Sequence, residues 1–225
     1  MKRELKLGII GESEGNGHPY SWSAIFNGFN KEAMSLCPYP VINKYLNEKK
    51  YPDDFINNAF VTHIWTQNLN NSIRIAKASK IPNIVENYLD LIGKVDAILI
   101  ARDDASNHYK QSKEFIELGI PIYIDKPFTL SITDAIKILS LVEDRSKLFT
   151  CSALSFSPAL KIFAKSLKSK GRIISINASI RGNWEKYSMH LIEPILKHFI
   201  LWNQKFFIEN KISEGKKNVL NFKSE

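Results

Sequence analysis

Along the first two thirds of the chain, short runs of apolar residues alternate with stretches that have helical periodicity. The apolar runs at 5–10 and 98–100 are continuous, which is typical of strands buried on both faces of a sheet. The pattern predicts strands over 5–11, 59–66, 84–86, 95–102, 120–125 and 148–154. It predicts helices over 21–34, 70–79, 106–118 and 131–143.

This alternation predicts an α/β fold. Strands separated by helices need crossover connections, which give a parallel sheet with helices on both faces. We therefore expect a doubly wound domain over residues 1–150. A helix over 158–169, a strand over 173–180 and a helix over 184–201 predict the start of a second, incomplete α+β domain over 151–225.

The composition is that of a globular protein. The 225 residues are 44% hydrophobic and 24% charged, which excludes a disordered chain. No apolar run reaches the roughly 18 residues that a membrane span needs, and the first residues lack the core of a signal peptide. Two cysteines cannot make a disulfide framework, so we expect a cytoplasmic protein with reduced thiols.

The net charge of +8 comes entirely from the C-terminal third. Residues 1–159 carry 18 basic and 18 acidic side chains, whereas residues 160–225 carry 13 basic and 5 acidic ones. A nucleic-acid-binding protein would be basic more evenly, so we expect no nucleic-acid partner. The basic third is either a solvated surface or a region that attracts an anionic substrate such as a phosphorylated sugar.

Four of the ten glycines lie at the first predicted strand–helix junction, at positions 8, 11, 15 and 17. The pyrophosphate of a dinucleotide needs main-chain N–H groups there, and glycines where a side chain would block its approach. The spacing is not G-x-G-x-x-G, so a glycine-rich structural turn is the alternative. The second predicted strand is followed by Gln67 rather than by an acidic residue. A neutral side chain there neither demands NAD nor repels the 2′-phosphate of NADP.

Lys126 follows Asp125 and precedes Pro127 at the end of the fifth predicted strand. Ligands of open α/β sheets bind at the carboxyl ends of the strands. A lysine there can hydrogen-bond a substrate hydroxyl and assist its proton transfer as a hydride leaves. A surface lysine is the alternative.

The last candidate is His190, on a predicted helix with Lys186 and Glu193 nearby in the sequence. Histidine is the side chain best suited to proton transfer near neutral pH, although a lone histidine is usually structural. No metal-binding spacing and no Ser/His/Asp arrangement is apparent.

Taken together, several segments resemble the glucose–fructose oxidoreductase / inositol dehydrogenase family (Gfo/Idh/MocA) over residues 5–195. They are LGIIG with its glycine loop, VDAILIARDDASNH, IPIYIDKP, SALSFSPAL and WEKYSMHLIEP. The most specific is IDKP, where the family has Glu-Lys-Pro. The resemblance implies a Rossmann domain, a nicotinamide cofactor, Lys126 near the reacting hydroxyl and His190 as the catalytic histidine. It also implies that this chain is shortened at its C-terminus.

We therefore expect an NAD- or NADP-dependent oxidoreductase that acts on a sugar or sugar derivative, with homo-oligomer formation as a further expectation. Lys126 and His190 would handle the proton while a hydride passes to the nicotinamide. The alternative is a shortened, non-catalytic nucleotide-binding protein. The residues expected to hold the cofactor are Gly11, Ser13, Gly15, Asn16, Gly17, His18, Gln67, Arg102, Asp103, Asp125 and Lys126.

Overall fold

The computed structural model describes residues 4–50, 52–167, 169–171, 173, 175–199, 206–214 and 217–224. The chain divides into two compact units, Met1–Thr150 and Cys151–Glu225. Each unit is described by itself below, because the structure does not fix their relative positions.

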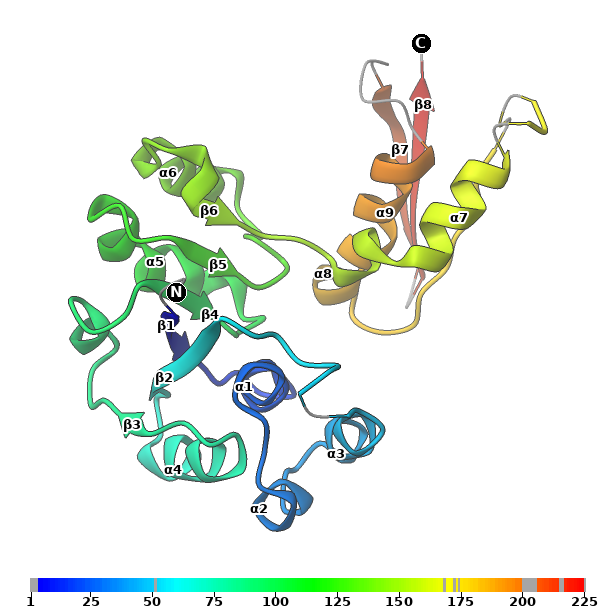
Figure 1. The fold of residues 1–225 in the computed structure, drawn as a ribbon. Coiled ribbons are helices and arrows are strands. Elements are labelled where there is room, and N and C mark those ends of the chain that lie inside the picture. The colour runs from blue at the N-terminus through cyan, green and yellow to red at the C-terminus, as the bar shows by residue number, and fades with distance from the viewer. Residues whose placement is uncertain are drawn as a thin grey trace. The chain divides into compact units, whose positions relative to one another are not determined.

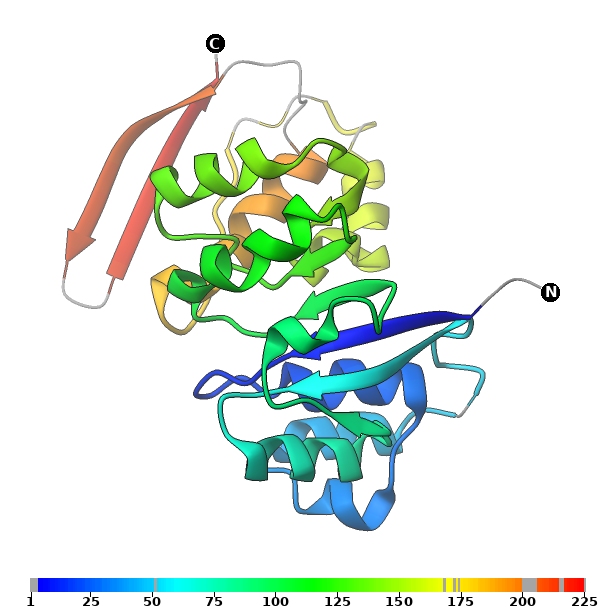
Figure 2. The same ribbon diagram turned by 90° about the vertical axis from the view of Figure 1, so that its left-hand side faces the viewer.

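Unit 1 contains a six-stranded sheet in the order β3-β2-β1-β4-β5-β6, and every pair of neighbouring strands is parallel. This is the strand order of a Rossmann fold, so the predicted doubly wound sheet is confirmed. Figure 2 shows β1, in dark blue, beside β2, in cyan. The strands are β1 (Leu5–Ile10), β2 (Ala59–Trp65), β3 (Asn83–Ile84), β4 (Ala97–Ile100), β5 (Ile122–Ile124) and β6 (Leu148–Phe149).

Helices cover both faces of this sheet (Figure 1). One face carries α1 (His18–Asn27), α2 (Lys31–Ser35), α3 (Pro40–Asn47) and α4 (Leu69–Ala78). The other carries α5 (His108–Glu117) and α6 (Ile132–Leu141). The alternation of side chains along a strand explains this division. Ile9 packs in the core beneath α1 and α4, whereas the next residue, Ile10, packs beneath α5.

The predicted helix over 21–34 is wrong in detail, because the chain forms two helices there. Helix α1 begins earlier, at His18, and ends at Asn27. Gly28 follows with a φ of 70°, a conformation that favours glycine and ends the helix. Asn30 then caps α2, since its side chain accepts a hydrogen bond from Ala33 N. The segment after α2 contains α3.

Unit 2 contains α7 (Pro158–Leu167), α8 (Trp184–Tyr187), α9 (Met189–Phe199) and a hairpin of β7 (Phe206–Glu214) and β8 (Lys217–Ser224). The strand predicted over 173–180 is wrong, because residues 173 and 175–180 form no strand in the part of the chain that the structure describes. A strand is stable only when a neighbouring strand pairs with its main-chain N–H and C=O groups. The local sequence pattern does not show whether such a neighbouring strand exists. The antiparallel β7–β8 pair was not predicted.

None of the helices described here is both long enough and apolar enough to span a membrane.

Candidate functional site

The glycine loop, residues 11–17, connects the carboxyl end of β1 to the start of α1. Its three glycines meet different requirements. A Cβ at Gly11 would overlap Pro19, so this glycine lets β1 and α1 approach each other. A Cβ at Gly17 would lie 2.5 Å from the Tyr39 ring, so this glycine allows the segment before α3 to pack against the loop.

Gly15 lies at the open tip of the loop. Its φ is 77°, and no atom lies within 4 Å of the position that a Cβ would take. In the described part of the chain, no acceptor meets the N–H groups of Ser13, Glu14, Gly15 or Gly17. The loop therefore presents several unused donors next to an open space, which suits an anion.

The start of α1 offers fewer donors than the loop does. The N–H of His18 donates to the side-chain oxygen of Asn16 at 2.7 Å, Pro19 has no N–H, and the N–H of Tyr20 donates to the Gly17 carbonyl. An anion at this junction would consequently meet the N–H groups of the loop more than those of the helix.

The loop is hydrogen-bonded first to the end of β2, through Gln67. The side-chain oxygen of Gln67 accepts the N–H of Glu12 at 3.1 Å, and its Nε2 donates to the Glu12 carbonyl at 2.6 Å. The same oxygen accepts Arg102 Nη1 at 2.8 Å. Both the oxygen and the nitrogen of the Gln67 amide thus bond the protein, which orients the loop.

A second connection reaches the end of β4. Ser13 Oγ donates to Asp103 Oδ1 at 2.7 Å and accepts the N–H of Asp103 at 3.1 Å. Beside it, the buried Arg102 forms an ion pair with Asp104. Burial raises the pKa of Asp104, but the guanidinium of Arg102 outweighs it, so the net pKa lies below the ordinary value. The guanidinium of Arg102 donates to Asp104 through Nε and Nη2 and to Gln67 through Nη1, so most of its donors are bonded within the protein.

A third connection reaches the end of β5, where Asp125 is 1% exposed. One of its oxygens accepts Asn16 Nδ2 at 3.1 Å and lies 2.5 Å from His18 Nδ1. The other accepts the N–H of Lys126 at 2.8 Å. Asp125 thus joins the loop and the start of α1 to the residue that we expect to handle the substrate.

Two carboxylates of the loop would repel a phosphate group, and they lie differently. Glu14 is exposed, whereas Glu12 is buried and its Oε1 accepts a hydrogen bond from Tyr39 Oη at 3.4 Å. Burial raises the pKa of Glu12, although Tyr39 and Arg74 lower it in part. Burial of the Tyr39 hydroxyl and the nearby carboxylate of Glu12 raise the pKa of Tyr39 to about 12.

In unit 2, His190 lies on the first turn of α9. Its Nδ1 lies 2.7 Å from Oγ of Ser152, a residue with no exposed surface. Glu193, one turn further along α9, accepts the N–H of Ser152 at 2.6 Å. The two side chains of α9 therefore hold Ser152 and fix the orientation of the His190 ring.

The structure brings most of the expected cofactor residues together at one edge of the sheet. The residues of the loop, the start of α1 and the ends of β2, β4 and β5 are joined by direct hydrogen bonds. His190 lies in the other unit, so its relation to Lys126 stays a prediction. Two participants were missed: Asp104, which holds Arg102, and Ser152, which holds His190. For Asp104 the signal was its position two residues after Arg102. Ser152 is the first residue of the segment SALSFSPAL, but nothing in the sequence pairs it with His190, 38 positions away.

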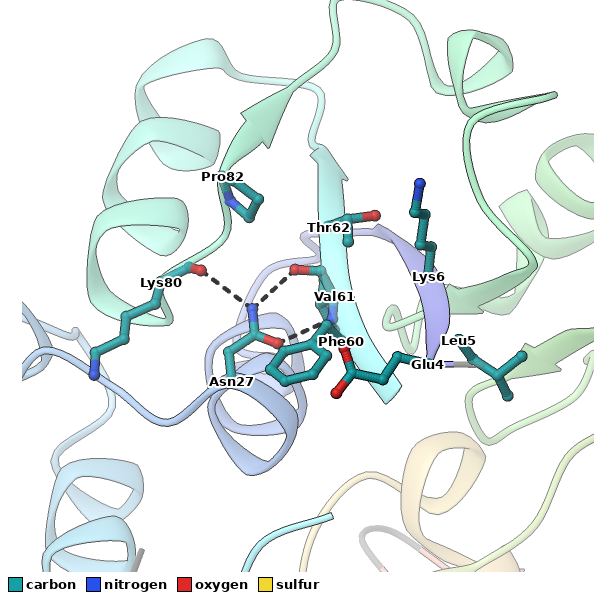
Figure 3. A pocket seen from close by; sticks show the side chains of 9 residues that line it. All are labelled: Glu4, Leu5, Lys6, Asn27, Phe60, Val61, Thr62, Lys80 and Pro82. Carbon is teal, nitrogen blue, oxygen red and sulfur yellow. Dashed lines mark hydrogen bonds between the residues drawn. The ribbon is translucent and has the colours of Figure 1, made fainter. Parts of the chain in front are cut away.

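A hollow in unit 1 lies at the opposite edge of the sheet, at the amino-terminal ends of β1 and β2 (Figure 3). There the Asn27 amide bonds both main-chain groups of Val61 and the Lys80 carbonyl. β3 pairs with β2 only from His63 onward, and at Val61 the Asn27 amide bonds the main chain of β2 instead. This is a structural role. No group of three His, Cys, Asp or Glu side chains in the described residues is placed to hold a metal ion.

The residues fit a dinucleotide. Strand order reverses between β1 and β4, and dinucleotides bind across the crevice at such a point. The open Gly15 position and the unused N–H groups of the loop lie at this point and provide room and donors for a pyrophosphate. A Cβ at Gly15 would fill that room.

Comparison with known proteins supports the same kind of site. Residues 42–152 match the model of a family described as "Oxidoreductase family, NAD-binding Rossmann fold". The match includes Gln67, Arg102, Asp125 and Lys126 and begins after the glycine loop. A search of curated proteins found no match.

Solved structures with the same fold include a dehydrogenase of Clostridium difficile, with 16% identity and a TM-score of 0.61 over 99% of this chain. They also include myo-inositol 2-dehydrogenase of Lactobacillus plantarum (13% identity, TM-score 0.54, 76% of this chain). A third is scyllo-inositol dehydrogenase of Lactobacillus casei with bound NAD(H) and scyllo-inositol (15%, 0.51, 75%). This chain spans 67%, 44% and 42% of those three chains, respectively.

Proposed function

Because residues 42–152 match the model of the Gfo/Idh/MocA oxidoreductase family, we propose that this protein is an NAD-dependent oxidoreductase of sugars or sugar derivatives. It would transfer a hydride between a carbon that bears a hydroxyl and the nicotinamide. The observation that carries the proposal is the open glycine loop, hydrogen-bonded to the ends of β2, β4 and β5, with Lys126 directly after β5.

In this proposal the loop binds the pyrophosphate through the N–H groups of Ser13, Glu14 and Gly15. Gln67 and Asp103 hold the loop in shape and so reduce the ordering that binding would otherwise require. Arg102 acts through Gln67, whose side-chain oxygen it bonds. Bound NAD supplies a carbon that accepts or returns a hydride.

Lys126 would donate a hydrogen bond to the oxygen of the reacting hydroxyl. A positive charge at that oxygen stabilises the negative charge that develops as the hydride leaves. His190, oriented by Ser152, would hydrogen-bond the same hydroxyl from unit 2. A cyclic polyol is a sound first substrate to try, because the scyllo-inositol dehydrogenase that shares this fold is a structure with scyllo-inositol bound.

The test is a turnover screen of the full chain. The protein would be incubated with NAD⁺ and a panel of inositols, aldoses and phosphorylated sugars, and NADH formation followed by absorbance. We expect reduction of NAD⁺ with at least one polyhydroxylated ring. NADH binding without turnover on any member of the panel would instead favour a nucleotide-binding protein without this activity.

A further inference from the structure

The end of β2 is where a Rossmann fold holds the ribose of the adenosine half of a dinucleotide, and an acidic side chain there bonds the 2′-hydroxyl of NAD. In this chain the residue at that place is Gln67. Its amide instead bonds the main-chain N–H and carbonyl of Glu12, at 3.1 and 2.6 Å. Gln67 thereby brings a different acidic residue, from the glycine loop, to the end of β2.

The carboxylate of Glu12 is held on the side of the loop that faces α3 and α4. The residue is 8% exposed, and its Oε1 accepts a hydrogen bond from Tyr39, the residue before α3, at 3.4 Å. Burial raises the pKa of Glu12, and Tyr39, Arg74 and Asn71 lower it in part. Arg74 and Asn71 belong to the first two turns of α4, the helix that follows β2. Glu12 therefore places a buried carboxylate next to the end of β2 and the start of α4.

Arg74 is the cation that could offset this charge for an incoming phosphate group. Its Nη2 already donates to Asn71 Oδ1, and its side chain is exposed. Water and salt screen the charge of an exposed group more than that of a buried one. The combined effect of Glu12 and Arg74 on a phosphate monoester at the end of β2 is consequently repulsion.

We propose that Glu12 is a specificity-determining residue, which selects NAD over NADP by repelling the 2′-phosphate. This inference rests on the proposed function and concerns a residue outside the set expected from the sequence. A phosphate monoester carries about 1.5 to 2 negative charges near neutral pH. NAD has a neutral hydroxyl instead, which can donate a hydrogen bond to a carboxylate. Both cofactors share the pyrophosphate, so any repulsion between Glu12 and that group leaves the preference unchanged.

The experiment measures the dissociation constants of NADH and NADPH by fluorescence titration at neutral pH. It compares the parent with Glu12→Gln and with Glu14→Gln, which removes the same charge from the exposed tip of the same loop. We expect the parent to bind NADH roughly 100-fold more tightly than NADPH, or more. Glu12→Gln should tighten NADPH binding by roughly 100-fold and NADH binding by only about 3- to 10-fold, so the preference falls at least about tenfold. Glu14→Gln should change both affinities alike.

A second measurement needs no variant. Adenosine 5′-monophosphate and adenosine 2′,5′-bisphosphate differ only in the 2′-phosphate, and each is titrated against NADH bound to the parent. The monophosphate should displace NADH at a lower concentration than the bisphosphate does. The reverse order would overturn the inference even if Glu12→Gln did not fold.

Three further results would overturn the inference and leave the proposed oxidoreductase activity standing. They are a parent that binds NADPH as tightly as NADH, a folded Glu12→Gln protein that keeps the parent's preference, and an equal loss of preference in Glu14→Gln. A parent that binds neither nucleotide would instead contradict the proposed function itself, and the inference would fall with it.

Discussion

The hydroxyl of Ser152 lies 2.7 Å from Nδ1 of His190, and the two residues are 38 positions apart in the sequence. Glu193, from the same helix as His190, holds the main-chain N–H of Ser152. The bond from the His190 ring to Ser152, which Glu193 holds in turn, helps to fix the orientation of the ring. This relationship gives His190 a structural basis that the sequence could not supply.

Replacing His190 with asparagine should lower kcat/KM by roughly 10²-fold while leaving NADH affinity nearly unchanged. The reason is that His190 is proposed to contact the substrate, whereas the loop proposed to bind NAD lies in unit 1. Ser152→Ala should cause a smaller loss of the same kind, since it frees the ring without removing it. His198→Gln is the matched control, because His198 bonds a main-chain carbonyl, that of Ser155. Equal turnover of the parent and His190→Asn would show that His190 has no such role.

Lys126→Met should lower turnover by roughly 10²-fold or more, because the developing alkoxide loses its positive partner. NADH affinity should change little, since the main-chain N–H that Asp125 holds is retained. Steady-state kinetics and an NADH titration of the same preparation check this. Lys147→Met, a change at an exposed lysine of the same unit, serves as the control. A Lys126→Met protein with parent-like kcat would remove Lys126 from the mechanism.

Glu12→Gln should raise the Tm near neutral pH and tighten NADH binding by a factor of about 3 to 10. Burial raises the pKa of Glu12, so the folded protein holds this proton more tightly than the unfolded chain does. That contribution is present below about pH 4.3, the usual pKa of glutamic acid, and is lost as the pH rises through the folded pKa. The gain in Tm should accordingly vanish in acid. A parent that is more stable than Glu12→Gln at pH 7 would contradict this sign.

Gln67→Ala should weaken NADH binding by roughly five- to tenfold, which corresponds to one net hydrogen bond of about 1 kcal/mol. The substitution removes both bonds to the Glu12 main chain, so binding would have to order the loop. Asn70→Ala, a neighbouring exposed position, is the control. Fluorescence titration with NADH measures both variants. Unchanged affinity would mean that Gln67 does not organise the loop.

Much of unit 1 could be predicted from the sequence. Continuous apolar runs separated by amphipathic helices have few compact solutions, and the parallel sheet is the common one. Local signals also located the loop and Lys126. The helix break at Gly28 was missed because the apolar pattern continues across it, and only the positive φ ends α1 there.

Other features depend on pairings between distant residues. The bonds that organise the site join Glu12 to Gln67, Ser13 to Asp103 and Asn16 to Asp125, across 55, 90 and 109 positions. No periodicity encodes such partners. The β7–β8 hairpin was missed for a related reason, since each strand is stabilised by the other rather than by its own pattern.

The central claim is that the loop at residues 11–17 binds the pyrophosphate of NAD, and an NADH titration of Gly15→Asp tests it most directly. Gly93→Asp is the matched control, because Gly93 has the same φ of 77° and an equally open Cβ position, on the turn before β4. Both variants should carry the same backbone strain, but only Gly15→Asp places a carboxylate where the phosphates would lie. We predict that the parent and Gly93→Asp bind NADH alike, and that Gly15→Asp binds at least 100-fold more weakly while remaining folded by circular dichroism. A folded Gly15→Asp protein that binds NADH as the parent does would contradict the account.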